Sequence, residues 1–174
     1  MYPKIRLEEE RATVLLIGSK PAGTKYTGKH GYPCESTRHI DDVNVHELDA
    51  LVLPGGFAPD YMRRSPPMLA LIAALVAEAK PIAAICHGPW MLCSARNAAG
   101  APVIAGRRCT SFVAIKDDVV NAGGRWEDAP VVVDGAIITS RTPADLTPFC
   151  HAVIDAIVGG TKSPRQSNTA LDVV

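Results

Sequence analysis

The chain has 174 residues, and its 18 Lys and Arg residues balance its 18 Asp and Glu residues. This balance excludes a protein that binds nucleic acid or an anionic membrane mainly through net charge. A composition of 47% hydrophobic and 21% charged residues excludes an intrinsically disordered chain. The length predicts one folded domain over residues 1–160, followed by a polar tail over residues 161–174.

Short apolar runs alternate with segments of helical periodicity along the first half of the chain. Buried strands are predicted at residues 12–18, 50–53 and 81–85. Helices are predicted at residues 2–11, 68–79 and 88–96. Because the strands are continuously apolar rather than alternating, they favour a mostly parallel sheet that helices cover on both faces.

The last third of the chain adds a hairpin and a final helix. Asp134 and Gly135 lie between two apolar runs, which predicts a β-hairpin. Residues 142–158 are predicted to form the last helix, which Gly159 and Gly160 end. Together these elements predict an α/β fold, a three-layer sandwich with an added β-hairpin.

The order of the elements has one irregularity, because a helix precedes the first predicted strand. In doubly wound sheets the first strand of the chain normally lies in the middle of the sheet. Without it, backbone groups on both neighbouring strands remain unpaired. We therefore expect another segment to fill this position, and the apolar residues 170–174 are one candidate.

The most specific motif is AICHGP, which occupies residues 84–89 between a predicted strand and a predicted helix. A nucleophile on a tight strand-to-helix turn needs small neighbours, and Ala84 and Gly88 provide them. The N-terminus of the following helix favours a thiolate at Cys86, and the backbone N–H of His87 is free to face a developing oxyanion. The alternative is a buried structural cysteine that happens to precede a histidine.

A second loop, residues 54–60, follows the predicted strand at residues 50–53. Ligands of open α/β sheets bind at the carboxyl ends of the strands, so this loop and Cys86 are expected at the same edge. The paired glycines allow a close backbone approach, and the N–H of Gly56 is the candidate second oxyanion donor. The alternative is an ordinary turn that ends a strand.

Several ordered motifs between residues 2 and 157 resemble the ThiJ/PfpI superfamily and are most similar to its PfpI-type intracellular protease branch. The motifs are GKHGY, ALVLPGGFAPD, PIAAICHGPW, the segment 110–118, NAG at 121–123 and VVVDG…ITSRTPADL. The resemblance implies a flavodoxin-like fold with Cys86 as the nucleophile and His87 as its imidazole neighbour. In that branch an acidic side chain from an adjacent subunit orients the histidine, and Asp60 occupies the matching position. A homo-oligomer, either a dimer or a hexamer, is therefore implied.

The sequence also departs from the family pattern. Family members begin with a strand and a loop whose glutamate hydrogen-bonds the nucleophilic sulfur, and this sequence begins after both. Glu8, Glu9 and Glu10 are not assumed to replace that glutamate, because they lie at the far end of the first predicted helix. The strand missing from the family pattern is the same strand that the order of elements lacks.

The other cysteines and the remaining histidines receive structural or surface assignments. Cys93, Cys109 and Cys150 are expected in the core, His30 is expected in a turn, and Cys34 is undecided. No His or Cys pair has the spacing of a zinc site, and no phosphate-binding glycine motif follows a strand, so neither a metal nor another cofactor is expected. Free thiols, the charged segment near Met1 and the short apolar runs favour the cytoplasm and exclude a membrane span.

Three functional hypotheses remain open. The first is an enzyme whose Cys86 thiolate attacks an amide or a reactive carbonyl compound, as a protease-like hydrolase or in glyoxalase or deglycase chemistry. The second is an oxidation-sensing stress protein in which Cys86 is oxidised with little turnover. The third is a folded but inactive remnant.

Overall fold

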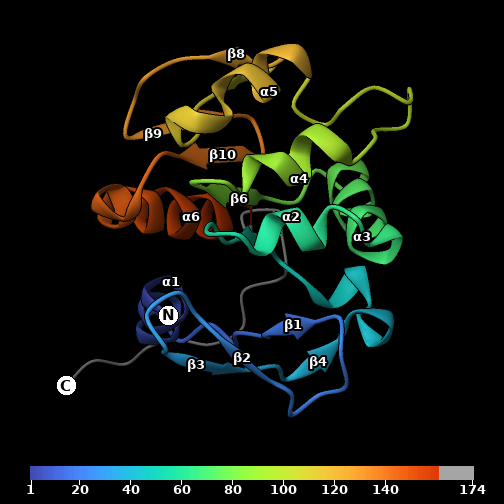
Figure 1. Cartoon of the computed structure of the whole chain (residues 1–174), viewed down its shortest axis with the longest axis vertical. Helices are drawn as coiled ribbons and strands as arrows, with labels where there is room; N and C mark the ends of the chain where they lie inside the picture. Colours follow the sequence, from blue (N-terminus) through green and yellow to red (C-terminus); the bar gives the residue numbers. More distant parts are fainter. Residues whose placement is uncertain (161–174) are drawn as a thin grey trace, which may run out of the picture.

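The computed structural model describes residues 1–160, which form both helices and strands (Figure 1). The strands are β1 (Ile17–Gly18), β2 (Lys25–Thr27), β3 (Pro33–Glu35), β4 (Arg38–His39), β5 (Leu51–Leu53), β6 (Ile82–Ile85), β7 (Arg108–Cys109), β8 (Arg125–Trp126), β9 (Val131–Asp134) and β10 (Ile137–Ser140). The α-helices are α1 (Tyr2–Glu9), α2 (Ala58–Met62), α3 (Pro66–Ala77), α4 (Pro89–Ser94), α5 (Lys116–Asn121) and α6 (Leu146–Gly160). Single 3-10 turns occur at η1 (Ile40–Asp42), η2 (Val45–Glu47), η3 (Val113–Ile115) and η4 (Pro143–Asp145).

The main sheet has four strands in the order β5-β6-β10-β9. β5, β6 and β10 are parallel, and β9 pairs antiparallel with β10 through the predicted hairpin. Gly135 has a φ of +61° in the turn of this hairpin, a conformation that glycine adopts without strain. The mostly parallel sheet and the added hairpin are therefore confirmed.

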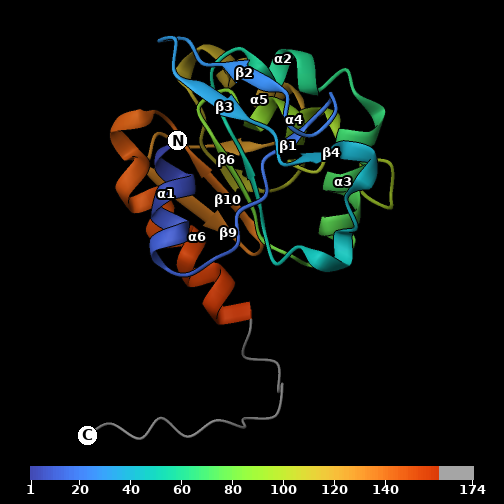
Figure 2. The same ribbon diagram turned by 90° about the horizontal axis from the view of Figure 1, so that it is seen from below.

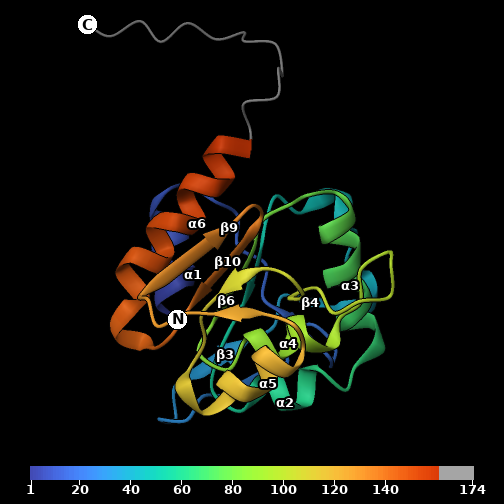
Figure 3. The ribbon, with the colours of Figure 1, turned by 90° about the horizontal axis from the view of Figure 1, so that it is seen from above.

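Helices cover both faces of the main sheet, so the sheet has two apolar cores. Ile82 and Ala84 of β6 face the α3-side core, whereas Ala83 and Ile85 face the α6-side core. Figures 2 and 3 show α1 and α6 on one side of the strands and α3 on the other. All four residues of β6 are buried, as the continuous apolar run predicts for a strand between two helical layers.

Three small two-stranded sheets accompany the main sheet. β1 is parallel to β4, β2 and β3 form an antiparallel hairpin, and β7 is parallel to β8. Figure 1 shows β1 and β4 together with α1, set apart from β6, β10 and β9. His30 lies in the exposed turn between β2 and β3, as expected.

Several boundary predictions are wrong: α1 and α4 end two residues earlier than predicted, α3 lies two residues earlier, and α6 begins only after the 3-10 turn η4. The predicted buried strand at residues 12–18 is a strand only at Ile17 and Gly18, because only these residues pair with β4. Residues 12–16 have no strand partner, and a strand requires one. The last helix, α6, continues through Gly160 instead of ending before Gly159.

The predicted filler of the missing strand position, residues 170–174, lies outside the described residues. In the described structure, β1 pairs with β4 and not with β5. Within residues 1–160, no helix has both the length and the apolar composition that a membrane crossing requires.

Candidate active site

Cys86 lies on the turn between β6 and α4 with a strained backbone. Its φ is +63°, a left-handed conformation that non-glycine residues rarely adopt. The N–H of Cys86 donates to the carbonyl oxygen of Ser140 at 2.9 Å, and its own carbonyl accepts from the N–H of Phe112 at 2.9 Å. Hydrogen bonds from β10 and from the loop before η3 therefore hold this residue in its strained geometry.

Two glycines make room for this turn. A Cβ on Gly88 would lie 2.6 Å from the carbonyl oxygen of Leu53, so β5 and the turn can approach this closely only with glycine here. A Cβ on Gly55 would lie 2.5 Å from Cβ of Cys86 and 3.2 Å from its Sγ. The close backbone approach expected from the paired glycines is thus made by Gly55, while Gly56 has open space around it.

The sulfur of Cys86 is half-buried and lies 3.2 Å from Nδ1 of His87. The thiol of Cys86 therefore lies beside the imidazole of His87 within the same chain and is only partly covered. Partial burial lowers the pKa of His87 below its usual 6.5, which favours the neutral ring. A neutral imidazole can accept the thiol proton through Nδ1.

Aromatic side chains determine how the His87 ring lies. The ring centroids of Trp90 and Phe112 are each 5.1 Å from that of His87, and Trp90 makes an edge-on contact. Trp90 is held in turn, because its Nε1 donates to Oδ2 of Asp118 at 2.9 Å. These contacts restrict rotation of the imidazole.

The two candidate oxyanion donors are both available. The N–H groups of Gly56 and His87 donate to no acceptor in the described part of the chain. Gly56 is exposed, has a φ of +73° and has open space where a Cβ would be. Since Gly55 already contacts Cys86, the adjacent Gly56 amide lies at the same edge of the sheet as the thiol.

Asp60 lies in the first turn of α2, and within the chain it pairs with Arg64 rather than with His87. Its Oδ2 accepts from Nη2 of Arg64 at 3.0 Å. Asp60 is flanked by two exposed aromatic residues, Phe57 and Tyr61, whose rings meet edge to face with 5.4 Å between centroids. Its expected action on the histidine of another subunit stays a prediction.

The remaining cysteines differ from Cys86 in their environment. Cys93, Cys109 and Cys150 are buried, as expected, whereas Cys34 is half-buried in β3. Burial raises the pKa of Cys93 to about 11 and that of Cys109 to about 12, so both remain thiols at neutral pH. Burial also raises the pKa of Cys150.

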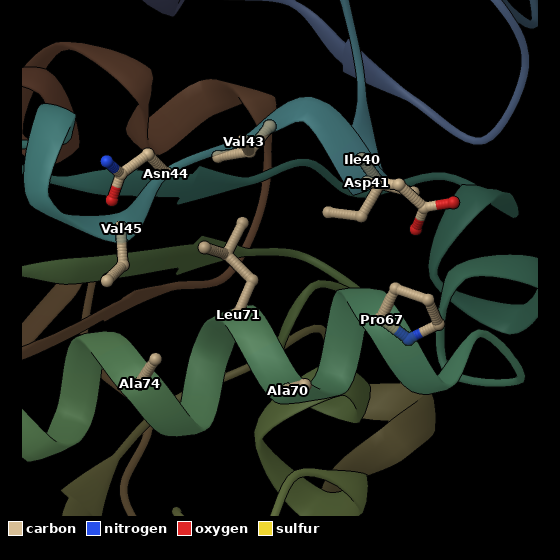
Figure 4. A pocket seen from close by; sticks show the side chains of 9 residues that line it. All are labelled: Ile40, Asp41, Val43, Asn44, Val45, Pro67, Ala70, Leu71 and Ala74. Atoms are coloured by element: carbon tan, nitrogen blue, oxygen red, sulfur yellow. The ribbon is translucent and has the colours of Figure 1, made fainter.

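A surface cavity of about 540 Å³ lies away from Cys86, between the η1–η2 segment and α3 (Figure 4). It is lined by Ile40, Asp41, Val43, Asn44, Val45, Pro67, Ala70, Leu71 and Ala74. None of the candidate site residues Cys86, His87, Gly56 and Asp60 lines this cavity, so it is separate from the candidate active site. In residues 1–160 no three His, Cys, Asp or Glu side chains gather in a way that could hold a metal ion.

Known proteins are similar to this chain along most of its length. The sequence profile of the DJ-1/PfpI family matches residues 1–156. Deglycase PH1704 of Pyrococcus horikoshii is 48% identical over 146 residues, which are 84% of this chain and 83% of that protein. The putative cysteine protease YraA of Bacillus subtilis is 37% identical over 83% of this chain and 82% of its own length.

A solved structure shows the same fold. A two-domain protein from Anabaena variabilis, with DJ-1/ThiJ/PfpI-like and ferritin-like domains, has a TM-score of 0.84 and 34% identity over 97% of this chain. This chain spans about half of that longer protein, 47% of its length. From the profile match, the identities and the shared fold, we conclude that the chain belongs to the DJ-1/PfpI family.

Proposed function

We propose that the protein is a cysteine-dependent deglycase or hydrolase in which the Cys86 thiolate attacks the carbonyl group of a small reactive carbonyl compound or of an amide. The observation that carries this proposal is the half-buried Cys86 sulfur, 3.2 Å from Nδ1 of His87 on a turn with a positive φ. This placement supports a nucleophile with its own proton acceptor. The positive φ also supports a role of this turn in the reaction, because strained backbone conformations gather at active sites.

The chemistry begins with transfer of the thiol proton to Nδ1 of His87. The sulfur then bonds to the carbonyl carbon, and the displaced electron pair moves to the oxygen, where the N–H groups of Gly56 and His87 stabilise the charge. With an aldehyde, the oxygen then takes the proton back from His87, which gives a hemithioacetal. With an amide, the intermediate expels the amine, which takes the proton from His87, and water then hydrolyses the thioester.

The relatives favour reactive carbonyl compounds over peptides as the substrate class. The relative with 48% identity is named a deglycase, whereas the one named a putative cysteine protease is 37% identical. We therefore propose carbonyl adducts of amines, or the free α-oxoaldehydes that form them, as the first substrates to test. Peptides are the second class.

The test compares turnover of methylglyoxal and of a fluorogenic peptide by wild type and by Cys86→Ser. Because a serine hydroxyl is a far weaker nucleophile at neutral pH, Cys86→Ser should lower the rate by about 10³-fold or more. Cys34→Ser is the matched control, since Cys34 is also half-buried but lies in β3. Equal rates for Cys86→Ser and wild type would refute the proposal.

Oxidation sensing is the second candidate function. Because Cys86 is half-buried while Cys93, Cys109 and Cys150 are buried, an oxidant should reach Cys86 more readily than these three thiols. Mass spectrometry after mild peroxide treatment distinguishes the two candidates. Selective oxidation of Cys86 in a protein without turnover favours a sensor. Turnover with Cys86 unmodified favours an enzyme.

A further inference from the structure

The His87 ring has one hydrogen-bonding contact in the described part of the chain. Its Nδ1 lies 3.2 Å from the Cys86 sulfur, and its Nε2 meets no hydrogen-bond partner within residues 1–160. The orientation of a histidine that carries a proton is often fixed by a hydrogen bond on its other ring nitrogen. Here the groups left to orient the ring are Trp90 and Phe112, whose ring centroids each lie 5.1 Å from that of His87.

These two aromatic residues are held in different ways. Phe112 is held by its backbone, because its N–H donates to the carbonyl oxygen of Cys86. Trp90 lies in α4, and its indole ring contacts side chains that come from α5 and from the end of α2. Figure 3 shows α2 and α5 beside α4, and both pack against it. The position of the Trp90 ring therefore depends on two elements that do not carry the nucleophile.

Asp118 supplies the contact from α5. Its Oδ2 accepts the indole N–H of Trp90 at 2.9 Å, and this carboxylate forms no ion pair among the described residues. Asp118 lies in the first turn of α5, yet no backbone N–H of that helix donates to its side chain. The carboxylate is thus committed to Trp90. Because the acceptor is charged, this hydrogen bond is stronger than one between neutral groups.

Arg63, the residue after α2, supplies the second contact. Its guanidinium carbon lies 5.5 Å from the centroid of a Trp90 ring, and its Nε donates to Oγ of Ser94 at 2.9 Å. Ser94 follows Trp90 by about one turn of α4, so Arg63 lies along the same face of this helix. Arg63 therefore contacts the ring system of Trp90, while Asp118 fixes the direction of its N–H.

We propose that Asp118 is a positioning residue: through Trp90, it holds the His87 ring so that Nδ1 stays beside the Cys86 sulfur. Asp118 acts indirectly, because its side-chain contact is with Trp90. Without this carboxylate the indole can turn about its side-chain bonds, and the His87 ring can follow it away from the sulfur. The inference rests on the proposed function for its effect on turnover, but the proton transfer from Cys86 to His87 can be followed without turnover.

The test measures how fast iodoacetamide alkylates Cys86 at pH 7 and at pH 10, by mass spectrometry of the peptide that contains it. At pH 7 the thiol depends on His87 to take its proton, so Asp118→Ala should be alkylated about 5-fold more slowly than wild type. At pH 10 hydroxide removes this proton without His87, so the two rates should agree. A change in folding or in access to the sulfur changes both rates, so the pH dependence separates positioning from a purely structural role.

Three further variants sharpen the comparison. Asp118→Asn keeps an oxygen that can accept the indole N–H, so at pH 7 it should keep at least about half of the wild-type rate. Asp117→Ala is the matched control and should react like wild type. It removes the same charge from the same turn of α5, but the Asp117 side chain makes no hydrogen bond or ion pair within residues 1–160. Trp90→Phe removes the N–H that Asp118 accepts, so adding Asp118→Ala to it should not slow the reaction further.

Turnover of methylglyoxal is measured on the same proteins. We expect kcat of Asp118→Ala to fall about 5-fold with KM unchanged, because the proton transfer is affected and not the binding of the carbonyl compound. Three results in the alkylation test would overturn the proposal: a wild-type rate for Asp118→Ala at pH 7, an equal slowing at pH 10, or an equal slowing by Asp117→Ala. If no variant turns over substrate but Asp118→Ala still slows alkylation only at pH 7, the proposed function fails and the positioning role of Asp118 is supported.

Discussion

At the scale of single residues, partial burial of the His87 ring between Trp90 and Phe112 makes stability depend on pH. Because burial lowers the pKa of His87 below 6.5, the unfolded chain takes up a proton here before the folded chain does as the pH falls. Relative to His87→Gln, wild type should therefore lose stability as the pH falls below 6.5, with no change well above it. Urea unfolding of both proteins at a series of pH values measures this difference, and a gain of relative stability in acid would contradict it.

Gly88 is the residue at which steric crowding can be tested. A Cβ at this position would lie 2.6 Å from a backbone oxygen of β5 and 2.9 Å from that of Ile85, and neither can move without shifting a strand. We expect Gly88→Ala to reduce the free energy of unfolding by about 3 kcal/mol. Gly100→Ala is the control: Gly100 has a φ of +77° but open space around it, so about 1 kcal/mol is expected. If Gly88→Ala and Gly100→Ala lost the same free energy of unfolding in urea, the structure would accommodate a Cβ at position 88 without the expected cost.

At the scale of elements, the junction between β10 and α6 depends on one ion-pair network. Nε and Nη2 of Arg141 each donate to the buried carboxylate of Asp145 at 3.1 Å, and Nη1 donates to Asp128 at 2.6 Å. The Arg141 hydrogen bonds are the main reason that the pKa of Asp145 is lowered. This network lies beside Ser140, whose carbonyl accepts the N–H of Cys86.

We expect Arg141→Met to lower the melting temperature by several degrees, because it leaves the Asp145 carboxylate buried without its partner. Arg141→Lys should lower it less, since the charge remains while the two-point contact is lost. For wild type, the stability due to Asp145 is present above the ordinary pKa of 3.8 and is lost as the pH falls below it. Calorimetry at pH 7 and pH 3 measures both effects. A larger difference between Arg141→Met and wild type at pH 3 than at pH 7 would contradict this account.

Elements with a local signal were predictable from the sequence, and elements that depend on a distant partner were not. β6 and the β9–β10 hairpin follow from an apolar run and from Asp134-Gly135. Residues 12–18 have an equally apolar composition, but only Ile17 and Gly18 become a strand, since a strand needs a neighbour that composition does not reveal. The end of α6 was also missed, because glycines at the end of a helix can remain helical.

In the candidate site too, contacts between adjacent residues were predictable, and contacts between distant residues were not. Cys86 and His87 are adjacent in the sequence, so their contact could be predicted. The close approach of Gly55 to Cys86 joins residues more than thirty positions apart, and only the packing of β5 against β6 reveals it. The packing of Trp90 and Phe112 against His87 likewise depends on how α4 and the loop before η3 meet.

At the scale of the whole molecule, the role of Asp60 can be tested by mixing subunits. Asp60 does not contact His87 in its own chain, where it pairs with Arg64. If Asp60 acts on a neighbouring subunit, Asp60→Ala and Cys86→Ser proteins are each nearly inactive as homo-oligomers. Co-expression should then restore about a quarter of the wild-type rate, because half of the random dimers hold one intact site.

The readout is methylglyoxal turnover by the co-expressed mixture, with the separately expressed variants mixed just before the assay as the control. Sedimentation velocity of each protein gives the oligomeric state on which the test depends. A mixture no more active than the sum of its variants would show that Asp60 does not serve a neighbouring site. A fully active Asp60→Ala protein would lead to the same conclusion.

The positive φ of Cys86 has a consequence for how this protein can change over evolutionary time. Glycine adopts this backbone conformation freely, so Cys86→Gly should be about 1 kcal/mol more stable than Cys86→Ala in urea unfolding. A lineage that no longer needed the thiol should therefore replace it with glycine more readily than with alanine. Retention of cysteine in this backbone conformation would then record continued selection for its reactivity.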